Sequence, residues 1–116
     1  MTSIKNTLSR AKELLGERGW SKGQYVDGDG CLCALGAIYV AAGELASAPL
    51  DKYAPYYAPG DAGDQASKLY LEASEHLGSV VPRSSGWPHV HLFNDLPSTT
   101  QDDVLAMFDR GIEAAE

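Results

Sequence analysis

The sequence contains few cysteines, few basic residues and no long apolar run, and each shortage excludes a class of protein. Two cysteines among 116 residues are too few for a disulfide framework. The longest nearly apolar stretch, residues 31–43, is shorter than the ~20 residues that a membrane-spanning helix needs. The first residues carry no apolar segment of the kind that a signal peptide requires. We therefore expect a protein of the reducing cytoplasm that does not contact a membrane.

Basic residues are scarce, because nine Lys and Arg face sixteen Asp and Glu, for a net charge of −7. This balance argues against binding to nucleic acid, whose phosphates require a basic surface, and against docking on anionic lipid. Residues 1–23 hold five basic and two acidic residues (+3), whereas residues 24–116 hold four basic and fourteen acidic ones (−10). We expect the basic first helix either to dock on the acidic last helix or to orient an incoming partner.

Apolar residues recur at helical spacing in four segments of a chain whose 44% hydrophobic and 22% charged content is typical of a globular protein. The length predicts one domain over residues 1–116. The segments predict helices over residues 3–15, 33–42 and 64–77, and a fourth that continues to residue 112. The second is apolar on nearly every side, which is typical of a buried central helix, and Gly43 and Gly78 are expected to end the second and third. The buried face of the third is predicted to hold Ala66, Leu69, Tyr70, Ala73 and Leu77.

The remaining segments add turns and, at most, one small β element. Residues 44–63 are rich in proline, glycine and tyrosine and predict a long loop. Residues 89–93 alternate in polarity like a short strand, with residues 24–26 as its candidate partner. The fourth helix has a clear start, because Thr99-x-x-Asp102 and Thr100-x-x-Asp103 both resemble a capping box. The predicted fold is mainly α, a compact four-helix single domain with at most a short two-stranded β element.

Two x-spaced pairs, Cys31-x-Cys33 and His89-x-His91, contain the ligand types of a tetrahedral zinc site. Structural zinc pairs usually leave two to four residues between the cysteines, so the spacing argues against such a site. The alternative interpretation is that Cys33 packs as a small hydrophobic residue and that His89 and His91 lie at the surface. No cofactor is predicted.

Cys33 also precedes a predicted helix, where the helix dipole lowers the pKa of a thiol. With a histidine and Asn94 downstream, it has the chain order of a papain-like cysteine hydrolase. His91 and Asn94 lie too close in sequence for the usual arrangement, and few strands are predicted. A buried structural cysteine is the competing interpretation.

Four residues are candidates for a binding site: Trp20, Cys33, Asn94 and Asp95. Asn94-Asp95 lies between the predicted strand and the fourth helix, where it could bind a ligand or partner. It could equally form a tight turn through side chain to backbone hydrogen bonds. Trp20 could likewise fill the space beside the first helix rather than line a recognition pocket.

The segment Asp27-Gly28-Asp29-Gly30 has calcium-loop composition, but its alignment to an EF-hand puts Tyr25 and Gly36 where carboxylate ligands belong. It is therefore interpreted as a turn.

Several blocks occur in an order that resembles a known family. They are Gly19-Trp20-x-x-Gly23, Gly30, Cys33-Ala34-Leu35-Gly36-Ala37-Ile38, Asn94-Asp95 and Thr100-x-x-Asp103-Val104. The chain resembles, from Leu8 to Ile112, an uncharacterised domain-of-unknown-function family of small proteins from actinobacteria and their phages. It departs from that pattern at Phe93, where a tryptophan is expected. The resemblance implies a fold and a bacterial or phage-infected host, and it implies no activity.

These observations predict a small accessory or regulatory protein that acts by contact with another protein. A convincing catalytic set is lacking, and the chain is small and acidic. The alternative is a small cysteine hydrolase or zinc-binding protein that uses Cys33 with His89 or His91.

Overall fold

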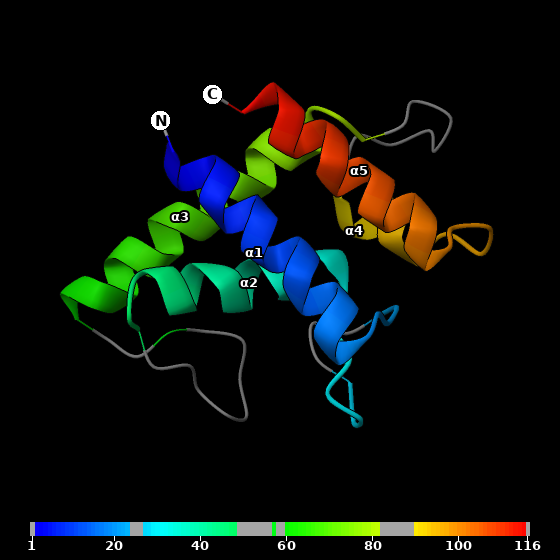
Figure 1. Ribbon diagram of the computed structural model, residues 1–116. Coiled ribbons are helices and arrows are strands. Elements are labelled where there is room, and N and C mark those ends of the chain that lie inside the picture. The colour runs from blue at the N-terminus through cyan, green and yellow to red at the C-terminus, as the bar shows by residue number, and fades with distance from the viewer. Residues whose placement is uncertain (1, 24–26, 49–56, 58–59, 82–89, 116) are drawn as a thin grey trace.

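The computed structural model describes residues 2–23, 27–48, 57, 60–81 and 90–115. These residues form five helices and no sheet, which confirms a mainly α fold (Figure 1). Trp20 and Leu32 form an isolated parallel β bridge. The helices are α1 (Thr2–Arg18), α2 (Ala34–Leu45), α3 (Asp61–Gly78), α4 (Val90–Asp95) and α5 (Gln101–Ala114).

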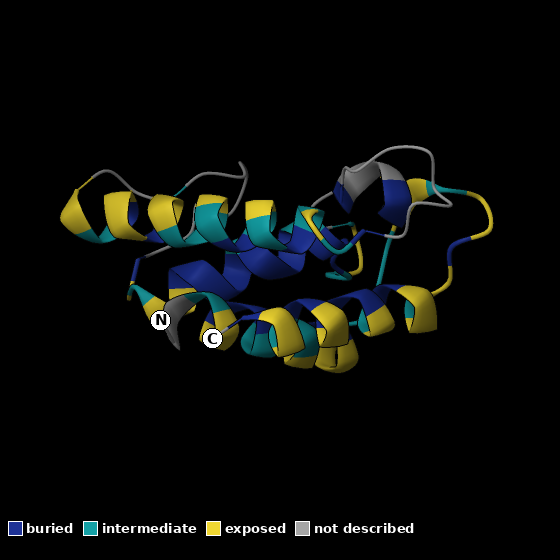
Figure 2. Ribbon diagram, turned by 90° about the horizontal axis from the view of Figure 1, so that it is seen from above, coloured by how far each residue is buried: buried dark blue, intermediate teal, exposed yellow. Residues whose placement is uncertain are grey.

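Helix α2 lies at the centre, as its apolar composition predicts. Eight of its residues are buried, and it contacts α1, α3 and α4. Figure 2 shows the buried residues gathered between the helices, with exposed residues along the outward faces. None of the helices in the described part of the chain is both long and apolar enough to cross a bilayer.

Helices α1 and α5 run side by side in opposite directions (Figure 1). The two approach closely at Gly111 of α5, where an added Cβ would lie 3.2 Å from Leu8 Cδ1 and 2.8 Å from Leu77 Cδ1. On the surface of this pair, Lys12 Nζ lies 2.5 Å from Asp109 Oδ1. The basic first helix thus docks on the acidic last helix, the first of the two outcomes expected from the charge distribution.

The prediction of a strand over residues 89–93 is wrong, because residues 90–95 form α4. Val90, Phe93 and Asn94 are buried, and their three- and four-residue separations place them on one side of a helix. A run of five residues with alternating polarity is too short to distinguish the two periods. Residue 89 and the proposed partner strand, residues 24–26, lie outside the described residues.

Helix α3 ends at Gly78, as predicted, but the stop predicted at Gly43 is wrong, since Gly43 lies inside α2. Helix α1 likewise continues past Leu15 to Arg18. The start of α5 is as predicted: Asp103 N donates to Thr100 Oγ1 (3.3 Å) and Thr100 N donates to Asp103 Oδ2 (2.9 Å). Of the two threonines, Thr100 is therefore the one that forms the capping box.

Helix α2 ends in a Schellman motif with serine at the position that usually holds glycine. Ala48 N donates to Gly43 O (2.9 Å) and Ser47 N donates to Glu44 O (3.2 Å), the two bonds that define the motif. Ser47 has φ of 55°, the left-handed conformation that costs a residue with a Cβ free energy.

Replacing Ser47 by glycine should therefore stabilise the protein. We expect Ser47→Gly to raise the free energy of unfolding by about 0.5–1 kcal/mol, because glycine adopts this conformation without the steric cost. Urea denaturation measures the change, and Ser47→Ala, which keeps the Cβ, is the matched control. A Ser47→Gly variant no more stable than Ser47→Ala would contradict this account of the helix end.

Candidate functional site

The carboxamide of Asn94, in the last turn of α4, joins three segments that are distant in the sequence. The side chain is 1% exposed. Its Oδ1 accepts hydrogen bonds from Trp20 Nε1 (2.6 Å) and from Ala34 N (3.0 Å). Its Nδ2 donates to Ser21 O (3.0 Å) and to Asp95 Oδ1 (2.9 Å). Both amide hydrogens and the carbonyl oxygen are thus engaged inside the protein.

The N-terminus of α2 is covered by two side chains. Cys33 is its N-cap residue, and the Cys33 Sγ accepts a hydrogen bond from Gly36 N at 3.3 Å. Asn94 Oδ1 accepts from Ala34 N, the first N–H of the helix. The partial positive charge at this helix end is therefore already met by an oxygen and a sulfur from the chain itself.

The segment of residues 19–23 is fastened to both sides of this junction. Ser21 N donates to Leu32 O (2.9 Å), and Leu32 N donates to Gly19 O (2.9 Å). Gly19 has φ of 91°, and a Cβ there would lie 3.0 Å from the Cys31 Sγ, so both the conformation and the close approach require glycine.

On the other side, the same segment is held by α4 and the residue that follows it. Gly23 N donates to Asp95 Oδ1 at 2.9 Å. Lys22 Nζ donates to Leu96 O at 2.6 Å and lies 5.4 Å from the centroid of the Trp20 ring, a cation–π contact. Residues 19–23 therefore act as a strap between α4 and the start of α2.

The structure brings the four candidate residues together. Trp20, Asn94 and Asp95 are connected by hydrogen bonds, and Cys33 caps the helix whose first N–H bonds to Asn94. Asn94 bonds groups of the chain itself, as a structural role requires, but these groups lie 60 to 74 residues away or in the side chain of Asp95, and not in the tight turn that was expected. The sequence did not single out Ser21, whose carbonyl accepts a hydrogen bond from Asn94, or Lys22, whose ammonium group donates to Leu96 O. The signal that marked this segment was the pair of glycines at positions 19 and 23.

The environment of Cys33 does not favour a reactive thiolate. The residue is buried, and desolvation raises the pKa of its thiol above the usual value. The backbone N–H groups of Gly36 and Leu35 act in the opposite direction with smaller effect, and the nearby carboxylate of Asp95 adds to the rise. A papain-like nucleophile needs a lowered pKa, so this part of the cysteine hydrolase hypothesis is not supported.

The two cysteines of the hypothetical zinc site lie in different environments. The Cys31 thiol packs against Gly19, whereas the Cys33 thiol accepts a hydrogen bond from α2. His89 lies outside the described residues, and so does the side chain of His91. Within the described ranges, no group of three or more His, Cys, Asp or Glu residues could hold a metal ion. The four-ligand site stays an untested hypothesis.

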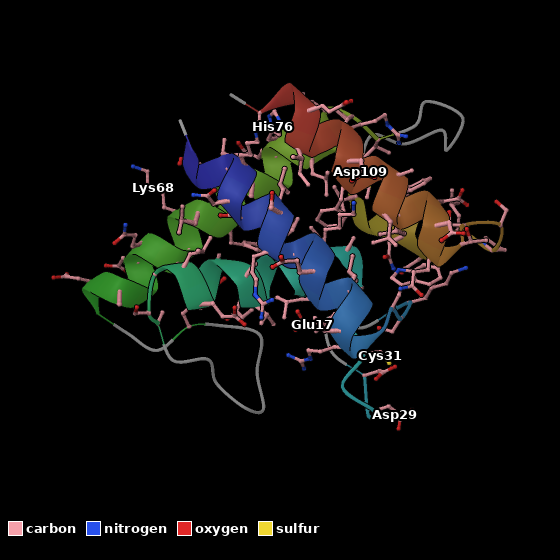
Figure 3. The ribbon with its side chains drawn as sticks, viewed as in Figure 1. Glu17, Asp29, Cys31, Lys68, His76 and Asp109 are labelled. Atoms are coloured by element: carbon pink, nitrogen blue, oxygen red, sulfur yellow. The ribbon has the colours of Figure 1, made fainter. Side chains whose placement is uncertain are left out.

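The acidic segment after residue 26 forms a turn, as interpreted from its glycines. Asp27 Oδ1 accepts hydrogen bonds from Asp29 N and from Cys31 N, both at 2.9 Å. Figure 3 shows Asp29 at the far end of this turn, directed away from the helices. The Asp27 carboxylate thus shapes the backbone that leads into the Trp20–Leu32 bridge.

Comparison with known proteins places the chain in a family. A family model described as a family of unknown function (DUF6197) matches residues 1–114, and the chain belongs to this family. The expected membership in a domain-of-unknown-function family is confirmed, while an actinobacterial or phage origin stays a prediction. Neither the curated proteins nor the solved structures provided a match.

The Asn94 carboxamide should be a major determinant of stability. We expect Asn94→Ala to lower the free energy of unfolding by about 2–4 kcal/mol, because it leaves buried N–H groups of Trp20 and Ala34 without their acceptor. Urea denaturation measures the loss. The exposed Asn6 of α1 offers the control Asn6→Ala, expected to stay within about 0.5 kcal/mol of the parent. Equal small effects for both variants would contradict the assigned role.

The two thiols should differ in reactivity. With Cys31→Ser, only the buried Cys33 remains, and we expect iodoacetamide to label it slowly at neutral pH, because its raised pKa keeps it protonated. Labelling should accelerate in urea. With Cys33→Ser, the half-buried Cys31 should react faster. Mass spectrometry follows both reactions, and Cys33 labelling in the folded protein as fast as that of glutathione would contradict the prediction.

Proposed function

We propose that this chain is a non-catalytic accessory protein that binds another protein through the outward side of α3. The α3 outer face is defined here by Asp64, Lys68, Leu71 and Glu75, all of which are exposed. We further propose that it acts in the cytoplasm of an actinobacterium or of a phage-infected host: the resemblance favours the host, and the low cysteine content favours the reducing cytoplasm. The observation that carries the proposal is the exposure of Leu71 on a helix whose charges are not paired within the described chain.

Leu71 is the more exposed of the two large hydrophobic residues at the surface of the described chain. It is 55% exposed, compared with 47% for Leu45 at the end of α2. One exposed leucine is ordinary on a soluble protein. Leu71, however, lies amid charged residues that keep the surface soluble while leaving an apolar centre open to a partner, the arrangement of a polar rim around an apolar contact.

The charges of α1 are used within the fold. Arg10 forms ion pairs with Glu17 (3.1 Å) and with Glu44 of α2 (2.7 Å), and Lys12 pairs with Asp109 of α5. Arg18 Nε donates to Gly30 O at 3.1 Å. The basic excess of residues 1–23 is therefore largely occupied by contacts with the rest of the chain.

The charged residues of α3, in contrast, do not pair with charged residues of the other described helices. The helix holds four acidic residues and one lysine, a net charge of −3 with His76 neutral, and none of them takes part in an ion pair with another described residue. Figure 3 shows the Lys68 side chain directed away from the neighbouring helices. Charges that face solvent steer encounters with a partner more than they stabilise a fold.

A comparison of two leucine variants tests the proposal. The full chain and its variants Leu71→Gln and Leu45→Gln are immobilised and exposed to an actinobacterial lysate, and captured proteins are identified by mass spectrometry. We expect a protein that the parent and Leu45→Gln capture and that Leu71→Gln loses. Binding of that protein, once purified, should weaken by about tenfold with Leu71→Gln.

Both substitutions replace an exposed leucine, so both variants should fold with stability within about 0.5 kcal/mol of the parent. Urea denaturation checks this. Capture that is absent, or that survives Leu71→Gln unchanged, counts against α3 as the binding face.

A further inference from the structure

The chemistry of the partner follows from the same face, and this inference rests on the proposed function. We propose that the α3 outer face binds a helical segment of another protein in which one apolar residue is flanked on both sides by lysine or arginine. The apolar residue would contact Leu71, and the basic residues would lie near the acidic residues of α3.

The spacing of the face indicates a helical partner. Asp64, Lys68, Leu71 and Glu75 are separated by four, three and four residues and form a stripe along the side of α3 opposite to its buried residues. Residues at alternating separations of three and four lie along one side of a helix, where the side chains of a second helix can pack against them. Leu71 lies within this stripe, with charged residues before and after it.

The sign of the charge indicates a basic partner. Asp61 and Asp64 precede Leu71, and Glu72 and Glu75 follow it, so the negative charge lies at both ends of the stripe. Each exposed ion pair would contribute little free energy by itself. Together they would raise the rate of encounter and select against acidic partners, while contact with Leu71 would supply the apolar part of the affinity.

A second copy of this chain fits the face less well. Two α3 helices in contact would bring a charge of −3 against −3, within chains that each carry −7. Lys68 is the only lysine or arginine of the helix, against four acidic residues in each copy. Like charges placed opposite one another disfavour association, so charge complementarity favours a different, basic protein.

Synthetic helices provide a direct test. The probe is an alanine-rich peptide of about 20 residues, long enough to form a helix, with one central leucine and lysines three and four positions to either side. A matched peptide replaces the leucine by glutamine, and a second replaces the lysines by glutamate. Amide chemical shifts of the isotopically labelled full chain locate and quantify binding.

We expect the leucine–lysine peptide to shift amides along α3 around Leu71, and the two matched peptides to bind far more weakly. Leu71→Gln and Glu75→Lys should each weaken binding by on the order of tenfold. Glu113→Lys makes the same charge change on an exposed residue of α5, and it should alter binding by less than about twofold.

Each of the following results would overturn the inference. Shifts spread over α5 as well as α3, or an equal effect of Glu113→Lys, would show attraction to acidic surface in general. If sedimentation shows that the parent is a dimer and that the Leu71→Gln variant is a monomer, a second copy of the chain is the occupant. Absence of peptide binding, with lysate capture still dependent on Leu71, would reject the basic helix and leave the proposed function standing. Failure of both assays would reject both.

Discussion

The carboxamide of one residue, Asn94, determines how the centre of this protein is assembled. Through three hydrogen bonds it connects the last turn of α4 to residues 20 and 21 of the strap and to the first N–H of α2, across 60 to 74 residues of sequence. All hydrogen-bonding groups of this buried amide have partners within the protein. Removing the amide would leave several polar groups without a hydrogen-bond partner at once. The start of the most buried helix therefore depends on a side chain from near the other end of the chain.

Most of the helical fold was accessible from the sequence because periodicity and caps are local signals. The stripe of Ala66, Ala73 and Leu77 located the buried face of α3, and the Thr100–Asp103 capping box located the start of α5. Helix α4 was missed because six residues span fewer than two turns, and alternation over residues 89–93 imitates a strand. Glycine was misleading as a stop signal: α2 ends in a Schellman motif that uses Ser47.

The candidate site could be predicted only in part, for a related reason. Trp20, Asn94 and Asp95 drew attention as unusual local residues, yet nothing in the sequence pairs position 20 with position 94. Several of the partners are backbone groups, such as Ser21 O and Ala34 N, which every residue possesses and no motif marks. Long-range contacts between backbone and side chain become visible only once the helices are placed. The charge distribution did anticipate one such contact, the docking of α1 on α5.

Polar groups have different roles in the interior and at the surface of the molecule. Around Asn94 the donors and acceptors are satisfied within the chain, which suits a rigid junction. The exposed ion pairs of α1 contribute little to stability, so their larger effect is to occupy cations of residues 1–23. Each pair also occupies one carboxylate, so the acidic excess of the composition remains, and α3 displays part of it around Leu71. The composition thus sets the sign of the surface charge, and the docking of the helices decides where the unpaired acidic residues lie.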